Sequence, residues 1–288
     1  MKSTTQVIVF FDIDGTLINS AHEPRMDSGK AYEIKAQISA LKTEGILFGI
    51  NSNRAIEDIL PIYKLIGLNG PLIAENGILI QLSPGKTISF LESDQLRKIS
   101  DTRRTLVIEM KSFFKEKYNH SAVWLNIDTV KFLGRKKTKI KDSTIIALNN
   151  KFRKYTLSIH IKKVIEGKFV NAIDIGTELV EYLKQKHSKP QDFDIILSKF
   201  GNIIAFSTMI SKRKAAEMLI DRFYKGYTCY SIGDELKDYE MVKGFGKFIA
   251  VGNADKKVKL VADFSTKQNY SDGAMEALDI IAKVHIKE

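Results

Sequence analysis

Short apolar runs alternate with helix-forming patterns in the first and last parts of the chain. In the first part, apolar runs at 7–11, 46–50 and 71–74 alternate with helical patterns around 32–41 and 55–66. In the last part, runs at 202–206, 227–232 and 248–251 alternate with helical patterns around 212–224, 254–261 and 274–284. Alternation of this kind predicts an α/β fold, a doubly wound, Rossmann-like parallel sheet covered by helices on both faces.

The segment between these two parts differs from them in charge. The chain has 45 lysine and arginine residues against 34 aspartate and glutamate residues, a formal charge of +11. Residues 84–199 contain 24 of the basic and 13 of the acidic residues, so the remaining 21 of each sign cancel. This break in composition predicts a core domain built from 1–82 and 200–288, with a basic α+β cap domain inserted at 83–199.

Composition also narrows the classes of protein to consider. Apolar runs such as VIVFF are far shorter than the ~20 residues of a membrane-spanning helix, so no membrane association is expected. Met1-Lys2-Ser3 leads directly into strand-like sequence without the apolar region of a secretory signal, which favours a cytoplasmic location. Cys229 is the only cysteine and the five histidines are scattered, so a metal site would need oxygen ligands.

Polar residues stand where the predicted strands end or helices begin, and α/β sheets bind ligands at the carboxyl ends of their strands. They are Asp12 and Asp14 in DIDGT, Ser52 in NSNR, Lys212 in MISKRKAA, and Asp234 and Asp238 in SIGDELKDYEMV. Each also has an ordinary structural interpretation, as an acidic loop, a helix cap or a solvated lysine. All of them at strand ends, in this order, indicate one site.

With these residues the chain resembles the haloacid dehalogenase superfamily of phosphohydrolases. The resemblance is carried by Asp12-Ile13-Asp14-Gly15-Thr16, Ser52, Lys212 and Gly233-Asp234 with Asp238. The segments LIAENGILI, AVGNADKKVKLVADFST and SDGAMEAL agree with it. The position and size of the insertion are similar to the type IIB, C2-capped branch, which includes Cof-type and mannosyl-3-phosphoglycerate or sucrose-phosphate phosphatases. The resemblance covers the two outer parts of the chain, and the insertion is recognised only by position and size.

The resemblance implies a phosphomonoester hydrolase that acts through an aspartyl-phosphate. Asp12 would be the nucleophile and Asp14 the general acid and base, since their spacing places both side chains on one side of a strand end. Magnesium (Mg²⁺) would be held by Asp12, the backbone carbonyl of Asp14 and Asp234, with Asp238 completing the acidic set. Lys212 would offset these carboxylates. The phosphate-binding set implied is Ser52, Asn53, Lys212 and Lys237.

Two positions depart from the family pattern. Lys237 stands where Cof-type relatives usually have an asparagine that contacts phosphate, and Ser52-Asn53-Arg54 replaces Thr-Gly-Arg. The lysine either meets the phosphate as a point charge or the contact is lost. Asparagine tolerates unusual backbone angles, so the turn after the second strand is expected to persist.

The expected substrate is a small phosphorylated metabolite, with a sugar phosphate favoured. The alternatives are a phosphosugar mutase of the same superfamily and a basic nucleic-acid-binding protein on a degenerate scaffold. No RNA-binding aromatic signature accompanies the lysines, which disfavours nucleic acid as a partner. The basic run KFLGRKKTKIKD at 131–142 fits either a solvated face or a field that gathers anions. Oligomeric state stays open.

Overall fold

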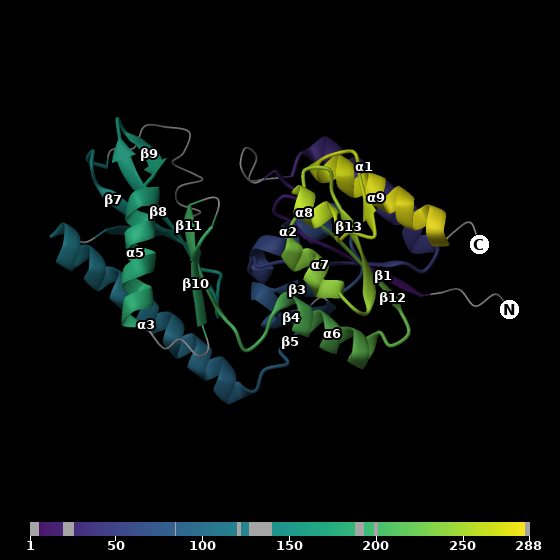
Figure 1. Cartoon of the computed structure of the whole chain (residues 1–288), viewed down its shortest axis with the longest axis horizontal. Coiled ribbons are helices and arrows are strands. Elements are labelled where there is room, and N and C mark those ends of the chain that lie inside the picture. The colour runs from purple at the N-terminus through teal and green to yellow at the C-terminus, as the bar shows by residue number, and fades with distance from the viewer. Residues whose placement is uncertain are drawn as a thin grey trace. The chain divides into compact units, whose positions relative to one another are not determined.

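The structure is a computed structural model that divides into two compact units (Figure 1). It describes residues 6–19, 26–83, 85–119, 122–126, 140–187, 193–198 and 201–285. Unit 1 comprises Met1–Phe90 and Ile210–Glu288, and unit 2 comprises Leu91–Met209. The sequence prediction placed the divisions at 82/83 and 199/200. In the structure both divisions lie later in the chain. The strand Lys86–Ile88 still belongs to unit 1, and the strand Asn202–Ser207 still belongs to unit 2.

Unit 1 is built on an eight-stranded sheet in the order β14-β13-β12-β1-β2-β3-β4-β5. Its strands are β1 (Val7–Phe11), β2 (Leu47–Asn51), β3 (Leu72–Ala74), β4 (Leu79–Ser83), β5 (Lys86–Ile88), β12 (Thr228–Gly233), β13 (Gly246–Ala250) and β14 (Phe264–Ser265). All pairs from β14 to β3 are parallel, and β3, β4 and β5 pair antiparallel. Every residue of the central strand β1 is buried. A strand covered on both faces is apolar throughout, which explains the run VIVFF.

Helices cover this sheet. They are α1 (Ser28–Thr43), α2 (Ile56–Leu65), α6 (Lys212–Phe223), α7 (Leu236–Val242), α8 (Lys256–Lys259) and α9 (Tyr270–His285), together with the 3₁₀ turn η1 (Glu75–Gly77). Helix α1 packs against α9, and α6 packs against α7 (Figure 1). The predicted fold class is confirmed: the strand and helix patterns of both outer parts of the chain join in one largely parallel sheet.

Unit 2 contains a six-stranded sheet in the order β10-β11-β8-β7-β6, with β9 paired to β8. Its strands are β6 (Val123–Asn126), β7 (Ile145–Asn149), β8 (Leu157–Ile165), β9 (Lys168–Asn171), β10 (Phe193–Leu197) and β11 (Asn202–Ser207). Only the β6–β7 pair is parallel among these described strands. Helices α3 (Ser93–Tyr118) and α5 (Ile173–Lys186) pack against each other, and α5 contacts β8, β10 and β11. Most of the predicted basic run lies outside the described residues, at 131–139.

The central strand β8 has one apolar face and one mixed face. Leu157, Ile159 and Ile161 are almost fully buried, whereas the alternate positions are Ser158, His160, Lys162 and the fully buried Val164. The apolar face lies on the side of α5, because Gly176 of that helix lies against Leu197, whose side of the sheet is shared by Ile203 and Ile159. The mixed face, on which Leu148 lies opposite His160 and Ile146 opposite Lys162, is therefore turned away from α5.

We expect His160 to make the fold sensitive to acid. Burial, with the nearby charges of Lys162 and Arg153, lowers the pKa of His160 from 6.5 to about 4. The unfolded chain therefore binds a proton that the folded chain does not, and stability is lost as the pH falls below 6.5. At pH 5 the loss from this group should be about 2 kcal/mol. Urea unfolding at pH 7 and pH 5 measures how much free energy of unfolding each protein loses on acidification. His160→Gln should lose less than the wild type by that amount, and equal losses in the two proteins would contradict the expectation.

Candidate active site

A buried lysine joins two carboxylates at the carboxyl end of the unit 1 sheet. The Nζ atom of Lys212 lies 2.5 Å from Oδ1 of Asp12 and 3.1 Å from Oδ1 of Asp238. The three residues are only 6%, 9% and 2% exposed, respectively. Burial opposes the charge of Lys212, but Asp12 and Asp238 outweigh it and raise the pKa of the lysine above its usual range. Lys212 is therefore a permanent cation in the interior.

A third carboxylate completes an all-oxygen cluster. Asp12, Asp234 and Asp238 each offer an oxygen, and these atoms lie within 4.8 Å of one another. The cluster forms because β1 and β12 are parallel neighbours, with Phe11 opposite Ile232, so the residues that follow each strand emerge together. When all three groups are ionised, three carboxylates against one lysine leave the cluster negative. Hard oxygen donors with excess negative charge fit a divalent cation such as Mg²⁺.

Gly15 makes this close approach possible. A Cβ atom at Gly15 would lie 2.3 Å from Oδ2 of Asp234, and the residue has a φ of +96°. Both the space and the backbone angle therefore require glycine at this point of the DIDGT loop. The loop passes close enough to Asp234 for a shared ligand to contact both.

The side chain of Asp14 turns toward Arg54, outside the three-carboxylate cluster. Nε and Nη2 of Arg54 donate to Oδ2 and Oδ1 of Asp14 at 2.8 and 2.6 Å. Burial opposes the charge of Arg54, but the hydrogen bonds that the guanidinium donates to Asp14, with the negative charge of that carboxylate, outweigh it and raise the pKa of Arg54. This two-pronged contact orients Asp14 next to the cluster and favours its carboxylate form. Arg54 was not singled out from the sequence, although it stands in the predicted Ser-Asn-Arg turn.

The predicted phosphate-binding residues occupy three different settings. Ser52 follows β2, is 1% exposed, and its Oγ accepts a hydrogen bond from the backbone N–H of Arg54 at 3.3 Å. Asn53 is half-buried in the same turn, and Lys237 is exposed on α7 beside Asp238. The structure therefore brings Asp12, Lys212, Asp234 and Asp238 into one cluster. Phosphate contacts by Ser52, Asn53 and Lys237 stay predictions.

Asn253 was also missed by sequence reasoning. Its Nδ2 donates to the backbone carbonyl of Gly15 at 2.8 Å, and its Oδ1 accepts from the N–H of Tyr270 at 2.8 Å. The Oγ of Ser271 donates to the carbonyl of Leu17 at 2.7 Å. These contacts, made by residues of the segments GNAD and SDGA, hold the DIDGT loop from the side of α9.

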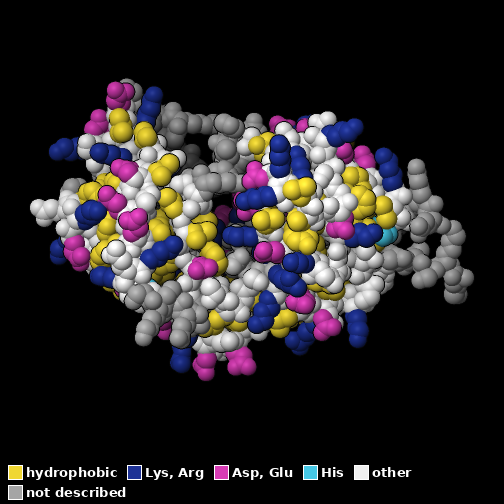
Figure 2. Space-filling model, viewed as in Figure 1, with side chains coloured by type: hydrophobic (Ala, Val, Ile, Leu, Met, Phe, Trp, Pro, Cys, Tyr) yellow, Lys and Arg dark blue, Asp and Glu magenta, His cyan; other side chains and the backbone are white. Residues whose placement is uncertain are grey.

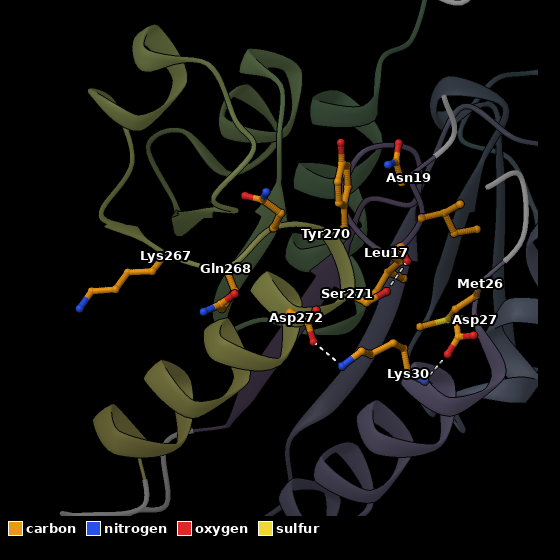
Figure 3. Close-up of a pocket in the computed structure, with 12 residues that line it drawn as sticks. Leu17, Asn19, Met26, Asp27, Lys30, Lys267, Gln268, Tyr270, Ser271 and Asp272 are labelled. Carbon is orange, nitrogen blue, oxygen red and sulfur yellow. Dashed lines mark hydrogen bonds and ion pairs between the residues drawn. The ribbon is translucent and has the colours of Figure 1, made fainter. Parts of the chain in front are cut away.

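A cavity of about 380 Å³ lies beside the contact between Ser271 and the carbonyl of Leu17, near the first residues of α1 and α9 (Figure 3). It is lined by Leu17, Ile18, Asn19, Met26, Asp27, Lys30, Lys267, Gln268, Asn269, Tyr270, Ser271 and Asp272. Lys30 forms ion pairs with Asp272 at 2.7 Å and Glu33 at 3.3 Å. In Figure 3, Lys267 points away from the other labelled residues. The charge of Lys30 is therefore compensated within the protein.

A strained turn, η1, packs against the start of α6, the helix that begins at Lys212. Glu75, Asn76 and Gly77 all have positive φ angles, of +48°, +61° and +102°. The backbone N–H of Glu75 donates to the carbonyl of Arg54 at 3.0 Å. Gly77 packs so closely that a Cβ atom there would lie 2.5 Å from the backbone oxygen of Ser211, the N-cap of α6. The turn thus connects Arg54 to the residue that precedes Lys212.

We expect Gly77→Ala to destabilise the protein by about 2–4 kcal/mol, since it combines an unfavourable backbone angle with overlap against a backbone atom. Gly226→Ala is the matched control, because Gly226 has a similar φ of +89° with nothing within 4 Å of its Cβ position. That control should lose only about 1 kcal/mol. Urea unfolding measures both. Equal losses in the free energy of unfolding would mean that the backbone at Ser211 moves aside at little energetic cost.

Comparison with known proteins agrees with this geometry. A model of the haloacid dehalogenase-like hydrolase family matches residues 9–278. The chain is 22% identical over 285 residues to the phosphatase YwpJ of Bacillus subtilis, covering 92% of this chain and 96% of that protein. It is 23% identical over 277 residues to phosphoglycolate phosphatase 1 of Saccharolobus solfataricus, covering 96% of each.

Solved structures show the same fold. A haloacid dehalogenase-like hydrolase from Bacteroides thetaiotaomicron superposes with a TM-score of 0.60 at 18% identity, over 96% of this chain and 99% of that one. A sucrose-phosphatase from Synechocystis, solved with sucrose and phosphate, gives a TM-score of 0.54 at 13% identity, over 96% and 97%. The likeness extends over nearly the whole length of each chain.

Proposed function

The chain belongs to the haloacid dehalogenase-like hydrolase family and is a phosphatase, and we propose that it hydrolyses small phosphorylated metabolites through a covalent intermediate on Asp12. The observation that carries the proposal is the buried contact of Lys212 with Asp12 and Asp238, at the end of the strand where α/β sheets bind ligands. A phosphoryl group placed here meets a carboxylate nucleophile and a cation that offsets its charge.

The reaction we propose has two steps. A carboxylate oxygen of Asp12 attacks phosphorus, the bond from phosphorus to the ester oxygen breaks, and the leaving alkoxide takes a proton from Asp14. In the second step Asp14 takes a proton from water, which attacks phosphorus and releases inorganic phosphate, so the Asp12 carboxylate is restored. Lys212 stabilises the phosphoryl oxygens throughout.

Arg54 is expected to act on Asp14. Its two hydrogen bonds favour the carboxylate form of Asp14, which suits the step in which Asp14 accepts a proton from water. For the first step Asp14 must carry a proton, so this contact has to loosen when the phosphate ester is bound. Arg54 is therefore a positioning residue for both proton transfers.

Three carboxylates of the site suit a magnesium ion, and we propose Asp12 and Asp234 as its side-chain ligands. Asp238 orients the site through its contact with Lys212. The backbone carbonyl of Asp14 is a further proposed ligand. When bound, Mg²⁺ would offset the negative charge of the carboxylates and of the phosphate ester, so that one anion can approach another.

The names of curated relatives support the substrate class that we propose. Similar proteins include phosphoglycolate phosphatases and a 5-amino-6-(5-phospho-D-ribitylamino)uracil phosphatase of Bacillus subtilis. We propose a small phosphorylated metabolite for this chain, with sugar phosphates as the first compounds to examine. On the face shown in Figure 2, basic side chains are interspersed with acidic ones, which does not favour a nucleic-acid surface there. No described helix is long and apolar enough to span a bilayer.

A screen of phosphorylated metabolites for phosphate release tests this function. Sugar phosphates, phosphoglycolate and an aryl phosphate should be assayed with Mg²⁺ and with EDTA. We expect turnover with Mg²⁺, loss of nearly all activity in EDTA, and recovery when the metal is restored. Full turnover in metal-free buffer would contradict the metal assignment. Movement of the phosphoryl group within a sugar without phosphate release would instead identify a mutase.

A further inference from the structure

A buried asparagine connects the end of β2 to the two helices that carry Lys212 and Asp238. Nδ2 of Asn51 donates to the backbone carbonyl of Lys212 at 3.2 Å and lies 2.7 Å from Sδ of Met241. Lys212 is the first residue of α6, and Met241 follows Asp238 by three positions on α7. Residues at this spacing lie on the same side of a helix. One amide group therefore contacts both helices.

Asn51 is also the neighbour of Asp12 across the sheet. Phe11 and Ile50 are opposite one another in the parallel β1–β2 pair, and Asp12 and Asn51 are the residues that follow them. Both side chains reach α6, since Asp12 contacts the ammonium of Lys212 and Asn51 contacts its backbone carbonyl. Adjacent strands thus hold the two ends of the lysine, and Asn51 holds the backbone end.

Stability alone does not favour an asparagine at this position. Asn51 is 1% exposed, and among the described residues no group donates a hydrogen bond to its Oδ1. A buried carbonyl oxygen without a donor destabilises a fold. The carbonyl of Lys212 is the first of α6, and an α-helix pairs that carbonyl with the N–H four residues later. The bond from Asn51 is therefore an additional one, and losing it would leave no backbone group unpaired.

We propose that Asn51 is a positioning residue of the phosphatase reaction and acts through Lys212. The proposal rests on the function proposed above. The amide of Asn51 fixes the first residue of α6 against the end of β2, and so sets where the ammonium lies relative to the Asp12 carboxylate. The phosphoryl group must meet both of these groups during transfer. A displaced ammonium stabilises the charge of the transition state less, so the rate of transfer falls.

Asn51→Leu tests this role because it keeps the volume of the side chain and removes the amide. We expect kcat for an aryl phosphate to fall about tenfold and KM to change less than about twofold, since the affected interaction is made in the transition state. The urea midpoint should stay close to that of the wild type, because the variant also removes the buried Oδ1 that has no donor. A purely structural role would give the reverse, a lower midpoint with kcat intact.

Asn69→Leu is the matched control, on the same strand. Oδ1 of Asn69 accepts a hydrogen bond from the backbone N–H of Phe48 at 2.9 Å, toward the other end of β2. This amide does pair a backbone group, so its loss should lower the urea midpoint. It should leave kcat and KM unchanged. A fall in kcat as large as that of Asn51→Leu would mean that any weakening of β2 slows the reaction.

NMR of the Lys212 ammonium gives a readout that needs no turnover. The nitrogen-15 signal of Nζ is assigned through its bonds to the side-chain carbons of Lys212. Asn51→Leu should shift this signal, because the ammonium then lies differently against Asp12 and Asp238, and Asn69→Leu should leave it in place. An unchanged signal in Asn51→Leu would overturn the proposal, whatever phosphate esters the chain hydrolyses.

A double-mutant cycle of Asn51→Leu and Lys212→Met decides whether the asparagine acts through the lysine. We expect Asn51→Leu to lower kcat about tenfold in the wild type and less than about twofold in Lys212→Met, where no ammonium is left to position. Equal losses in both backgrounds, or no loss in the wild type, would overturn the proposal and leave the proposed function intact. Full turnover in Lys212→Met itself would overturn both, since the lysine would then have no part in the reaction.

Discussion

Replacing Asp12 by asparagine is expected to reduce turnover at least about a thousandfold, because the amide cannot attack phosphorus. Asparagine has nearly the same shape, and it can still accept a hydrogen bond from Lys212, which also keeps its contact with Asp238. The variant should therefore fold. Initial rates with an aryl phosphate and with the best metabolite of the screen measure the effect, and circular dichroism verifies the fold.

Asp27→Asn is the matched control for this change. Asp27 is the N-cap of α1 and accepts a hydrogen bond from the N–H of Lys30, a role that asparagine fills equally well. The control removes one carboxylate from unit 1 and should retain full turnover. Substantial activity in purified Asp12→Asn would show that another group attacks the phosphorus atom.

The second large effect is expected for Lys212→Met, which acts on both stability and turnover. The side chain of Lys212 is 7% exposed and contacts two buried carboxylates. Removing one partner of a buried ion pair leaves uncompensated charge and should cost about 3–5 kcal/mol. Turnover should fall at least about a hundredfold, as for the loss of one group that stabilises the transition state.

Lys214→Met makes the same change two residues further along α6, at an exposed position. It should alter the free energy of unfolding by less than about 0.5 kcal/mol and leave turnover intact. Mg²⁺ should also stabilise Lys212→Met more than the wild type, since the ion then supplies the missing positive charge. Equal responses of the three proteins to urea would contradict the assigned role of Lys212.

The fold of unit 1 could be predicted because its strands are buried on both faces and so appear as continuous apolar runs. The meeting of Asp12 with Asp234 could be anticipated too, since parallel strands end at the same edge of a sheet. Arg54 could not be assigned its partner in this way. Its contact with Asp14 depends on how the turn after β2 folds over the DIDGT loop, which no periodicity in the sequence reports.

Contacts between residues far apart in the sequence could be predicted even less. Asn253 and Gly15 are separated by 238 positions, and Gly77 meets Ser211 only because η1 lies against α6. In unit 2, the sequence indicated location and charge but not the strand order. His160 stands in a strand whose alternate residues are apolar, and a single histidine in such a pattern does not reveal that burial, with the nearby charges of Lys162 and Arg153, lowers its pKa.

The central claim is that the phosphoryl group passes through Asp12 on its way to water. Its most direct test is the stereochemical course at phosphorus, measured with a substrate whose phosphate is made chiral by oxygen isotopes and sulfur. Attack by Asp12 and then by water gives two in-line displacements, each of which inverts the configuration. We expect net retention of configuration in the released thiophosphate. Net inversion would show a single direct attack by water and would contradict the covalent role of Asp12.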